Sequence, residues 1–279
     1  MSGFSPESLG LGEAGLPLLR DLIHERVGLY YDNGRCELLA ERVAPLVLES
    51  GFQSFLDFYY LLKYDEHAES AWQRLMDALS VQETYFWREI DQIQALATRI
   101  LPVLAATGRP VRIWSVPCAS GEEPLTIAMA LEEQGWFERV AIEIYASDGS
   151  PAAIAKARTG QYRERAFRAL PPALREKYFV RAGDLETPVC SLKARVKSWS
   201  VVNLMNAAAV SASANAHAIF CRNAFIYFSR ESVRRVVATF ADSMLTPGYL
   251  FVGASESLLQ VSDRFVLQQV DGAFVYVKA

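Results

Sequence analysis

The first third of the 279-residue chain shows a helical spacing of its hydrophobic positions. Between residues 16 and 97, apolar side chains recur three and four positions apart. An example is the group Leu18, Leu19, Leu22 and Ile23. Turn-forming Asp, Asn, Ser and Gly interrupt the pattern at 31–34 and 49–51. The pattern predicts an N-terminal all-α domain, which we place at residues 1–95.

After Pro110 the pattern changes to short apolar runs, each followed by a helical segment. The expected strands are 111–114, 141–146, 218–221 and 249–252, and the expected helices are 124–131, 154–158 and 233–244. Strands that alternate with helices are typical of a parallel sheet with right-handed crossovers. Residues 96–279 are therefore predicted to form an α/β domain.

Two segments of this α/β region depart from the alternation. The tail from Arg264 to Val277 reads as two strands joined at Asp271-Gly272, a pair that favours a tight hairpin turn. The sheet is therefore expected to finish with an antiparallel strand. Residues 171–202 lapse into short alternating pieces and predict a small inserted antiparallel β-subdomain. The alternative is that this segment is only an elaborated connection between two elements of the α/β domain, without a function of its own.

Charge and composition exclude several classes of protein. Lys and Arg total 28 against 32 Asp and Glu, so the net charge of -4 supplies no global basic field for nucleic acid or anionic lipid. The net negative charge is concentrated in residues 1–80, where 13 acidic side chains stand against 6 basic ones. No segment has the composition of a membrane span, and the three distant histidines predict no metal site. Four unpaired cysteines and an N-terminus without a basic leader pattern indicate the cytoplasm.

The loop 115–124 lies between a strand and a helix, where open α/β sheets bind nucleotide-like ligands. It has one glycine in ten residues and lacks the spacing that admits a dinucleotide pyrophosphate. Glu122 and Glu123 would repel phosphate but suit an ammonium group, as in the methionyl part of S-adenosylmethionine. We expect Pro124 at the first helical position. The alternative is that both carboxylates only complement the helix dipole.

Asp148 ends the second predicted strand, about 27 residues after Gly121. At that place a carboxylate can accept hydrogen bonds from both ribose hydroxyls of an adenosine. The alternative is a helix cap for the segment that begins at Ser150-Pro151. A loop suited to an ammonium and an acid suited to a ribose together favour an adenosine that carries an amino acid.

Five sequence blocks span nearly the whole chain. They are VQETYFWRE at 81–89, WSVPCASGEEP at 114–124, ASD at 146–148, FCRNAFIYF at 220–228 and GASES at 253–257. In this order they resemble the CheR family of chemoreceptor glutamate methyltransferases. The resemblance implies a Rossmann-like class I methyltransferase domain behind the helical domain, S-adenosylmethionine as cofactor and S-adenosylhomocysteine as product. It also implies methyl esters on glutamates of cytoplasmic helices of a methyl-accepting chemoreceptor.

The resemblance assigns roles to individual residues. The cofactor-binding residues carried over are Gln82, Thr84, Arg88, Glu123, Asp148, Asn203, Leu204, Asn223 and Ala224. Arg88 and Tyr227 are carried over as the residues of the acceptor site. For Arg88 the alternative is an interdomain ion pair with Glu83 or Glu89, and for Tyr227 a half-buried ring with a solvated hydroxyl.

The chemistry of such a transfer asks for positioning more than for proton transfer. A glutamate side chain with a pKa of about 4.3 is already an anion at neutral pH, so its attack on a sulfonium methyl group needs no general base. The opposite charges neutralise each other in the transition state, which a dry and preorganised pocket favours. We therefore expect neither a catalytic dyad nor a metal.

Three features depart from the family pattern. Gln82 stands where the family usually has Asn, and Pro117 removes a backbone donor from the first loop. The segment 34–50, which is commonly basic in the family, here balances Arg35 and Arg42 against three glutamates. Electrostatic steering toward an acidic receptor helix should therefore be weak.

Two other functions stay open. The first is a class I methyltransferase for a small molecule, with the helical domain as a lid. The second is a cofactor-bound module that docks on receptors without catalysis. In each case we expect a monomer that neither inserts into a membrane nor binds nucleic acid.

Overall fold

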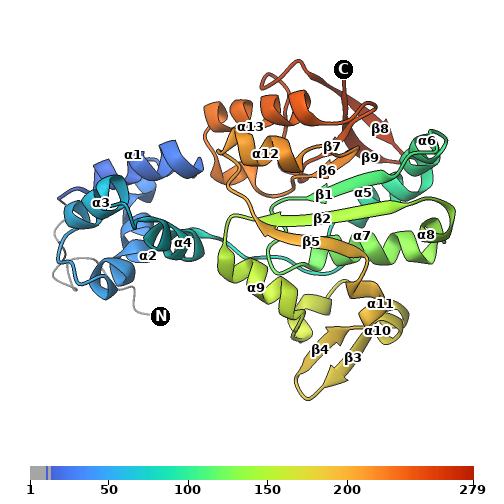
Figure 1. Ribbon diagram of the computed structural model, residues 1–279, viewed down its shortest axis with the longest axis horizontal. Coiled ribbons are helices and arrows are strands. Elements are labelled where there is room, and N and C mark those ends of the chain that lie inside the picture. Colours follow the sequence, from blue (N-terminus) through green and yellow to red (C-terminus); the bar gives the residue numbers. More distant parts are fainter. Residues whose placement is uncertain (1–10, 12–13) are drawn as a thin grey trace.

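The computed structural model describes residue 11 and residues 14–279, which form a helical unit beside a layered α/β unit (Figure 1). The helices of the first unit are α1 (Leu16–Val27), α2 (Cys36–Glu49), α3 (Phe55–Tyr64) and α4 (Glu69–Leu79). Their apolar faces enclose a separate core that includes Leu19, Ile23, Phe55 and Leu75. Local signals define the ends: Ser54 caps α3 by accepting from the Asp57 N–H, and Gly28 ends α1 in the left-handed conformation.

The second unit is built on a seven-stranded sheet in the order β5-β2-β1-β6-β7-β9-β8. Its strands are β1 (Val111–Ser115), β2 (Ile142–Asp148), β5 (Val196–Val201), β6 (Ala218–Phe220), β7 (Tyr249–Phe251), β8 (Phe265–Val270) and β9 (Ala273–Lys278). The first five strands of that order are parallel, and β9 and β8 are antiparallel. The predicted parallel sheet and antiparallel finish are confirmed.

The hairpin between β8 and β9 turns at Asp271 and Gly272. Their φ angles of 48° and 87° place both residues in the left-handed region that a two-residue hairpin turn requires. The Asp-Gly pair therefore signalled the turn correctly.

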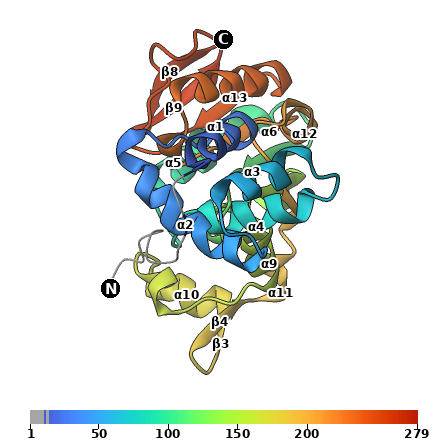
Figure 2. The same cartoon turned by 90° about the vertical axis from the view of Figure 1, so that its left-hand side faces the viewer.

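Helices cover both faces of the sheet, and the view from the side of the helical unit shows α1 to α4 in front of the sheet unit (Figure 2). The further helices are α5 (Ile90–Ala95), α6 (Leu101–Ala105), α7 (Glu122–Glu133), α8 (Trp136–Arg139), α9 (Pro151–Thr159), α10 (Pro172–Tyr178), α11 (Cys190–Lys193), α12 (Ala207–Ser213) and α13 (Arg230–Ser243). One core lies between the sheet and α5 to α8, and the other between the sheet and α12 and α13. Within the described part of the chain, no helix has the length and hydropathy to cross a bilayer.

The inserted β-subdomain is smaller than the predicted range 171–202. Its sheet is the antiparallel pair β3 (Phe179–Ala182) and β4 (Leu185–Pro188). Residues 196–201 instead form β5, which pairs in parallel with β2 at the edge of the main sheet. An alternating pattern marks a strand with one exposed face, but it does not name the partner strand.

The two units have separate hydrophobic cores. Along the chain, the core of the helical unit gives way to that of the sheet unit before residue 95, where we predicted the domain boundary. The helical core ends at Leu79, and Phe86 and Ile93 already belong to the core of the sheet unit. Residues 80–89 between them are not helical. The helical periodicity resumes in α5 and continues past residue 95, but that helix packs on the sheet, a difference that periodicity alone does not reveal.

All four cysteines are free, and Cys118 and Cys221 are buried. Burial raises the pKa of both thiols well above the ordinary value. Neither thiol is a ready nucleophile, which agrees with their expected role as small apolar residues.

Candidate functional site

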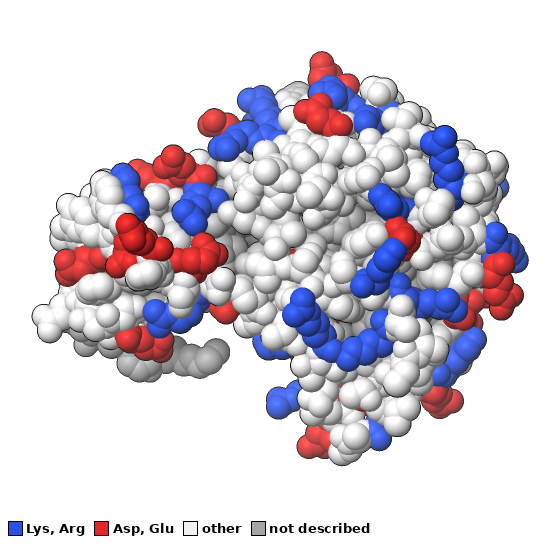
Figure 3. All heavy atoms as spheres, viewed as in Figure 1, with Lys and Arg blue, Asp and Glu red and all other residues white. Residues whose placement is uncertain are grey.

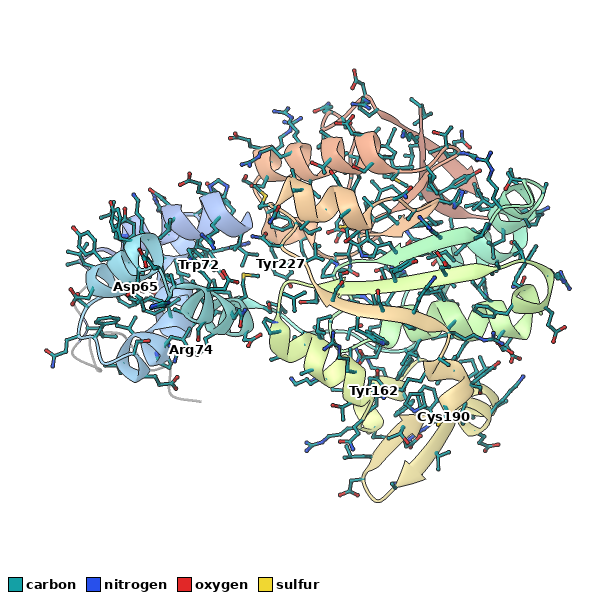
Figure 4. The ribbon with its side chains drawn as sticks, in the orientation of Figure 1. Asp65, Trp72, Arg74, Tyr162, Cys190 and Tyr227 are labelled. Atoms are coloured by element: carbon teal, nitrogen blue, oxygen red, sulfur yellow. The ribbon has the colours of Figure 1, made fainter. Side chains whose placement is uncertain are left out.

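A pocket lies between the helical unit and the carboxyl ends of the parallel strands. Its empty space amounts to about 1130 Å³, a figure that includes open solvent. All ten residues assigned from the sequence line it, namely Gln82, Thr84, Arg88, Glu123, Asp148, Asn203, Leu204, Asn223, Ala224 and Tyr227. In Figure 4, Tyr227 lies at the edge of the sheet unit that faces the helical unit. The fold therefore brings together residues that are up to 145 positions apart in the sequence.

Asp148 lies at the end of β2 and is 6% exposed. Its Oδ2 accepts a hydrogen bond from the Ala119 N–H at 2.8 Å, and its Oδ1 accepts from the Ser150 N–H at 2.9 Å. Burial raises its pKa, and these backbone donors oppose the rise. The helix cap of α9 is Ser150, whose Oγ accepts from the Ala153 N–H at 3.0 Å. The alternative that Asp148 is the cap is therefore wrong.

The two glutamates of the first loop have different surroundings. Helix α7 begins at Glu122, directly after Gly121 at φ 97°, so Pro124 is its third residue and not its first as predicted. Glu123 lines the pocket, whereas Glu122 is turned away into a buried position beside Ser120. Only one of the two carboxylates can therefore meet a ligand ammonium.

The buried Glu122 carboxyl should make the stability of the protein depend on pH. Loss of hydration raises its pKa from 4.5 to about 6. The folded state therefore binds more protons between pH 4.5 and 6, and the free energy of unfolding falls as the pH rises through that window. Since one pKa unit is worth about 1.4 kcal/mol, Glu122→Gln should raise the free energy of unfolding at pH 7.5 by about 1–2 kcal/mol. Urea unfolding at pH 4.5 should show little gain, and an equal gain at both pH values would contradict the assignment.

Arg222 is the charged partner of Glu123, and sequence reasoning gave it no role. Its Nε donates to Glu123 Oε2 at 2.6 Å, and Ser115 Oγ donates to Glu123 Oε1 at 2.6 Å. Two further Arg222 nitrogens donate to the carbonyls of Arg88 and Glu89, each at 3.0 Å. The Arg222 side chain is 2% exposed. The available signal was a charged residue two positions after the end of the buried strand β6.

Glu256 holds the loop that carries Asn223 and Ala224. Its carboxylate accepts from the backbone N–H groups of Asn223 at 2.8 Å, Gly253 at 2.6 Å and Ile226 at 3.3 Å. Burial raises the pKa of Glu256, and these donors oppose the rise. Asn223 has a φ of 58°, a left-handed conformation that needs such support. The sequence motif 253–257 contained this residue, but nothing in it revealed its contacts.

Arg88 lines the pocket from the linker between the two units. Its Nη1 donates to the Glu83 carbonyl at 3.0 Å, and its Nε lies 3.7 Å from Glu89 Oε1. The expected alternative of an ion pair with Glu89 is thus present, although long. The Glu83 carboxylate instead bonds to Arg165 and Arg168. Arg88 Nη2 has no protein acceptor among the described residues and remains available to a ligand.

Gln82 and Asn203 use their amides largely within the protein. The Gln82 oxygen accepts from Lys156 Nζ at 3.0 Å, and its nitrogen lies 3.4 Å from Ser150 Oγ. The Asn203 nitrogen donates to the Arg26 carbonyl at 2.8 Å, which ties the sheet unit to the end of α1. Both residues therefore shape the pocket wall more than they offer free hydrogen-bonding groups to it.

Tyr227 is half-buried where the end of α1 meets the sheet unit. Its carbonyl accepts from the Tyr30 N–H at 2.8 Å, and Leu29 pairs with Phe228 as an isolated bridge. Its hydroxyl, like that of Thr84, makes no hydrogen bond to a described residue. The Tyr227 hydroxyl can therefore donate to a ligand.

This set of groups fits an adenosine that carries an amino acid. Asp148 keeps carboxylate lone pairs beyond its two backbone bonds, which suits hydroxyl donors. Val116, Leu204 and Ala224 supply apolar wall, and the carboxylates of Glu123 and Asp148 disfavour a phosphate. The described residues also contain no cluster of His, Cys, Asp and Glu that could hold a metal ion.

Comparison with protein families agrees with this geometry. Residues 82–274 match the family model described as CheR methyltransferase, SAM binding domain. The chain belongs to the CheR methyltransferase family. Residues 14–80 match the companion model, CheR methyltransferase, all-alpha domain. This CheR-family chain is therefore a methyltransferase with an all-α domain before a class I domain that binds S-adenosylmethionine.

Two curated relatives cover almost the whole CheR-family chain. Chemotaxis protein methyltransferase 2 of Vibrio cholerae is 34% identical over 264 residues, which are 93% of this chain and 91% of the relative. Chemotaxis protein methyltransferase 1 of Pseudomonas aeruginosa is 28% identical over 279 residues, 96% of this chain and 99% of the relative. Among solved structures, magnesium protoporphyrin IX methyltransferase from Synechocystis with bound SAM is 13% identical, with a TM-score of 0.35 over 77% of this chain and 93% of that chain.

Proposed function

We propose that this chain transfers methyl groups from S-adenosylmethionine to glutamate side chains of a methyl-accepting chemoreceptor and forms methyl esters in chemosensory adaptation. The observation that carries the proposal is that Arg88 and Tyr227 line the same pocket as Asp148 and Glu123, at the junction with the helical unit. The names of the two curated relatives support the chemosensory role. The cytoplasmic location and the monomeric state remain predictions from the sequence.

The proposed acceptor needs orientation and exclusion of water. Bound S-adenosylmethionine supplies a methyl group on a positively charged sulfur. Tyr227 and Arg88 have donors available to hold the acceptor carboxylate, which is already ionised at neutral pH. The apolar side chains of Val116, Leu204 and Phe228 reduce hydration in the pocket. No side chain has to remove a proton.

The remaining residues that line the pocket are proposed to bind different parts of the cofactor. Asp148 holds the ribose hydroxyls, and Glu123, whose charge is shared with Arg222, faces the amino group. Asn203-Leu204 and Asn223-Ala224 flank the adenosine, and Gln82 and Thr84 close the linker side. The support is their shared pocket and, for Asp148 and Glu123, their buried and hydrogen-bonded carboxylates.

The decisive experiment uses cofactor labelled in the methyl group. The purified chain is incubated with membranes that contain candidate chemoreceptors, and the labelled receptor band is then treated with alkali. The proposal expects label on the receptor that is released as methanol by base. Label only on a small molecule would favour the small-molecule enzyme, and cofactor binding without any labelled receptor would favour the non-catalytic docking module.

Tyr227→Phe tests the acceptor site. Loss of one hydroxyl donor to an ionised carboxylate should lower kcat/KM for the receptor about ten- to a hundredfold, the usual worth of a hydrogen bond to a charged group. Arg88→Ala should also lower kcat/KM for the receptor. The matched control is Tyr64→Phe, since Tyr64 is 66% exposed on α3. Transfer at the parental rate by Tyr227→Phe would remove that hydroxyl from the site.

A further inference from the structure

The helical unit reaches the cofactor side of the pocket through Asp77. Asp77 lies in the last turn of α4, and its Oδ1 accepts from Ser150 Oγ at 2.5 Å and from the Ala152 N–H at 2.9 Å. Both donors lie at the start of α9, in the sheet unit. One carboxylate of the helical unit therefore binds directly to the N-terminus of a helix beside the pocket, where the helix dipole favours an anion.

Ser150 connects Asp77 with Asp148. Ser150 is completely buried, and its N–H donates to Asp148 Oδ1 at 2.9 Å while its hydroxyl donates to Asp77. The N–H groups of Ser150, Ala152 and Ala153 are thus bound by Asp148, Asp77 and Ser150 Oγ respectively. Movement of Asp77 would leave the buried Ser150 hydroxyl and the half-buried Ala152 N–H without this acceptor, next to the carboxylate that lines the pocket.

Helix α4 also covers the backbone of this segment. A Cβ on Gly149 would lie 2.9 Å from the terminal carbon of Met76, so α4 packs closely against Gly149. Both Met76 and Gly149 line the pocket. The charge of Asp77 also acts on Asp148, since it adds to the burial that raises the pKa of Asp148. Residues 148–150 are therefore held between α4 and the pocket.

We propose that Asp77 is a positioning residue that fixes Asp148 and Gly149, so that docking of the helical unit sets the affinity for the adenosyl part of the cofactor. The inference rests on the proposed role of Asp148. It has a regulatory consequence, because coupling between two binding sites is reciprocal. A partner protein that binds the helical unit and displaces α4 changes cofactor affinity, and bound cofactor changes the affinity for that partner by the same factor.

The test measures binding of S-adenosylhomocysteine to the full chain by calorimetry. Asp77→Ala should raise Kd about tenfold, since both contacts with α9 are lost. Asp77→Asn keeps an acceptor oxygen and should stay within about threefold of the parent. In an Asp148→Ala background, Asp77→Ala should add less than a twofold change, because it acts through Asp148. The matched control is Asp65→Ala, an exposed residue that Figure 4 places on the helical unit away from the pocket.

Each outcome has a distinct meaning. An unchanged Kd for Asp77→Ala beside a weakened Asp148→Ala overturns the inference but leaves the proposed cofactor site intact. Additive effects of the two substitutions also overturn it, because a general loss of structure would act independently of Asp148. An unchanged Kd for Asp148→Ala contradicts the proposed role of Asp148 itself. Should Asp77→Ala not fold, Ser150→Ala removes one of its two contacts from the other side, and an unchanged Kd there overturns the inference.

Discussion

Replacement of Arg222 by alanine is expected to lower the free energy of unfolding by about 3–5 kcal/mol, the largest effect among the single substitutions considered. The guanidinium is buried, pairs with Glu123 at 2.6 Å and donates to the carbonyls of Arg88 and Glu89. Truncation leaves a largely buried carboxylate and two backbone acceptors without their partner. Urea unfolding at pH 7.5, followed by tryptophan fluorescence, measures the change.

The control for Arg222 is Arg264→Ala. Arg264 also pairs with a carboxylate, Asp242 at 2.8 Å, but both side chains are substantially exposed, at 48% and 66%. An exposed pair is worth little, so this variant should stay within about 1 kcal/mol of the parent. If Arg222→Ala lost no more than Arg264→Ala, the buried ion pair would not be a major source of stability.

Asp148→Ala is expected to weaken binding of S-adenosylhomocysteine by roughly 1–3 kcal/mol, the scale of lost charge-assisted hydrogen bonds. The carboxylate already has two backbone partners, so it is fixed in place before a ligand arrives. Preorganisation of this kind lowers the entropy that binding loses. Calorimetry gives the change in affinity, and circular dichroism confirms that the variant is folded.

Asp184→Ala is the control for that measurement, since Asp184 is exposed in the turn between β3 and β4. Its affinity should equal that of the parent. Equal affinities for Asp148→Ala and Asp184→Ala would exclude Asp148 from the cofactor site.

Backbone strain gathers around the same pocket. Of the six described non-glycine residues with positive φ, four lie beside it: Trp87, Glu89, Ala119 and Asn223. Each such conformation costs of order 1–3 kcal/mol and persists only where neighbours enforce it. Here the enforcing groups are Arg222, Asp148 and Glu256, which bond to the backbone of these segments. The buried charges therefore support the shape of the pocket.

The two units differ in the sign of the charged side chains that are prominent on their surfaces. Figure 3 shows acidic side chains spread over the helical unit, whereas Lys and Arg are prominent across the sheet unit below its centre. The segment 34–50 sets Arg35, just before α2, and Arg42 within it against Glu37, Glu41 and Glu49. The expectation of weak electrostatic steering by this helix remains a prediction, which the salt dependence of receptor methylation would measure.

Several features follow from the sequence alone because they depend on neighbours along the chain. Hydrophobic periodicity predicted the helical unit and the parallel sheet, the Asp271-Gly272 pair predicted the hairpin, and the structure contains all three. The resemblance to the CheR family also named ten residues that line one pocket, eight of them within the five sequence blocks. The strands and the turn could be predicted because they are local properties of the chain, whereas the pocket residues were assigned from the family resemblance.

Only the tertiary structure decided which distant groups meet. The partner of β5, the core joined by Phe86, the pairing of Arg222 with Glu123 and the bond from Asp77 to Ser150 have no local signature. The last two join residues 99 and 73 positions apart. A buried charge has to find a partner, but its identity depends on how the two units pack, and no spacing within one segment specifies that.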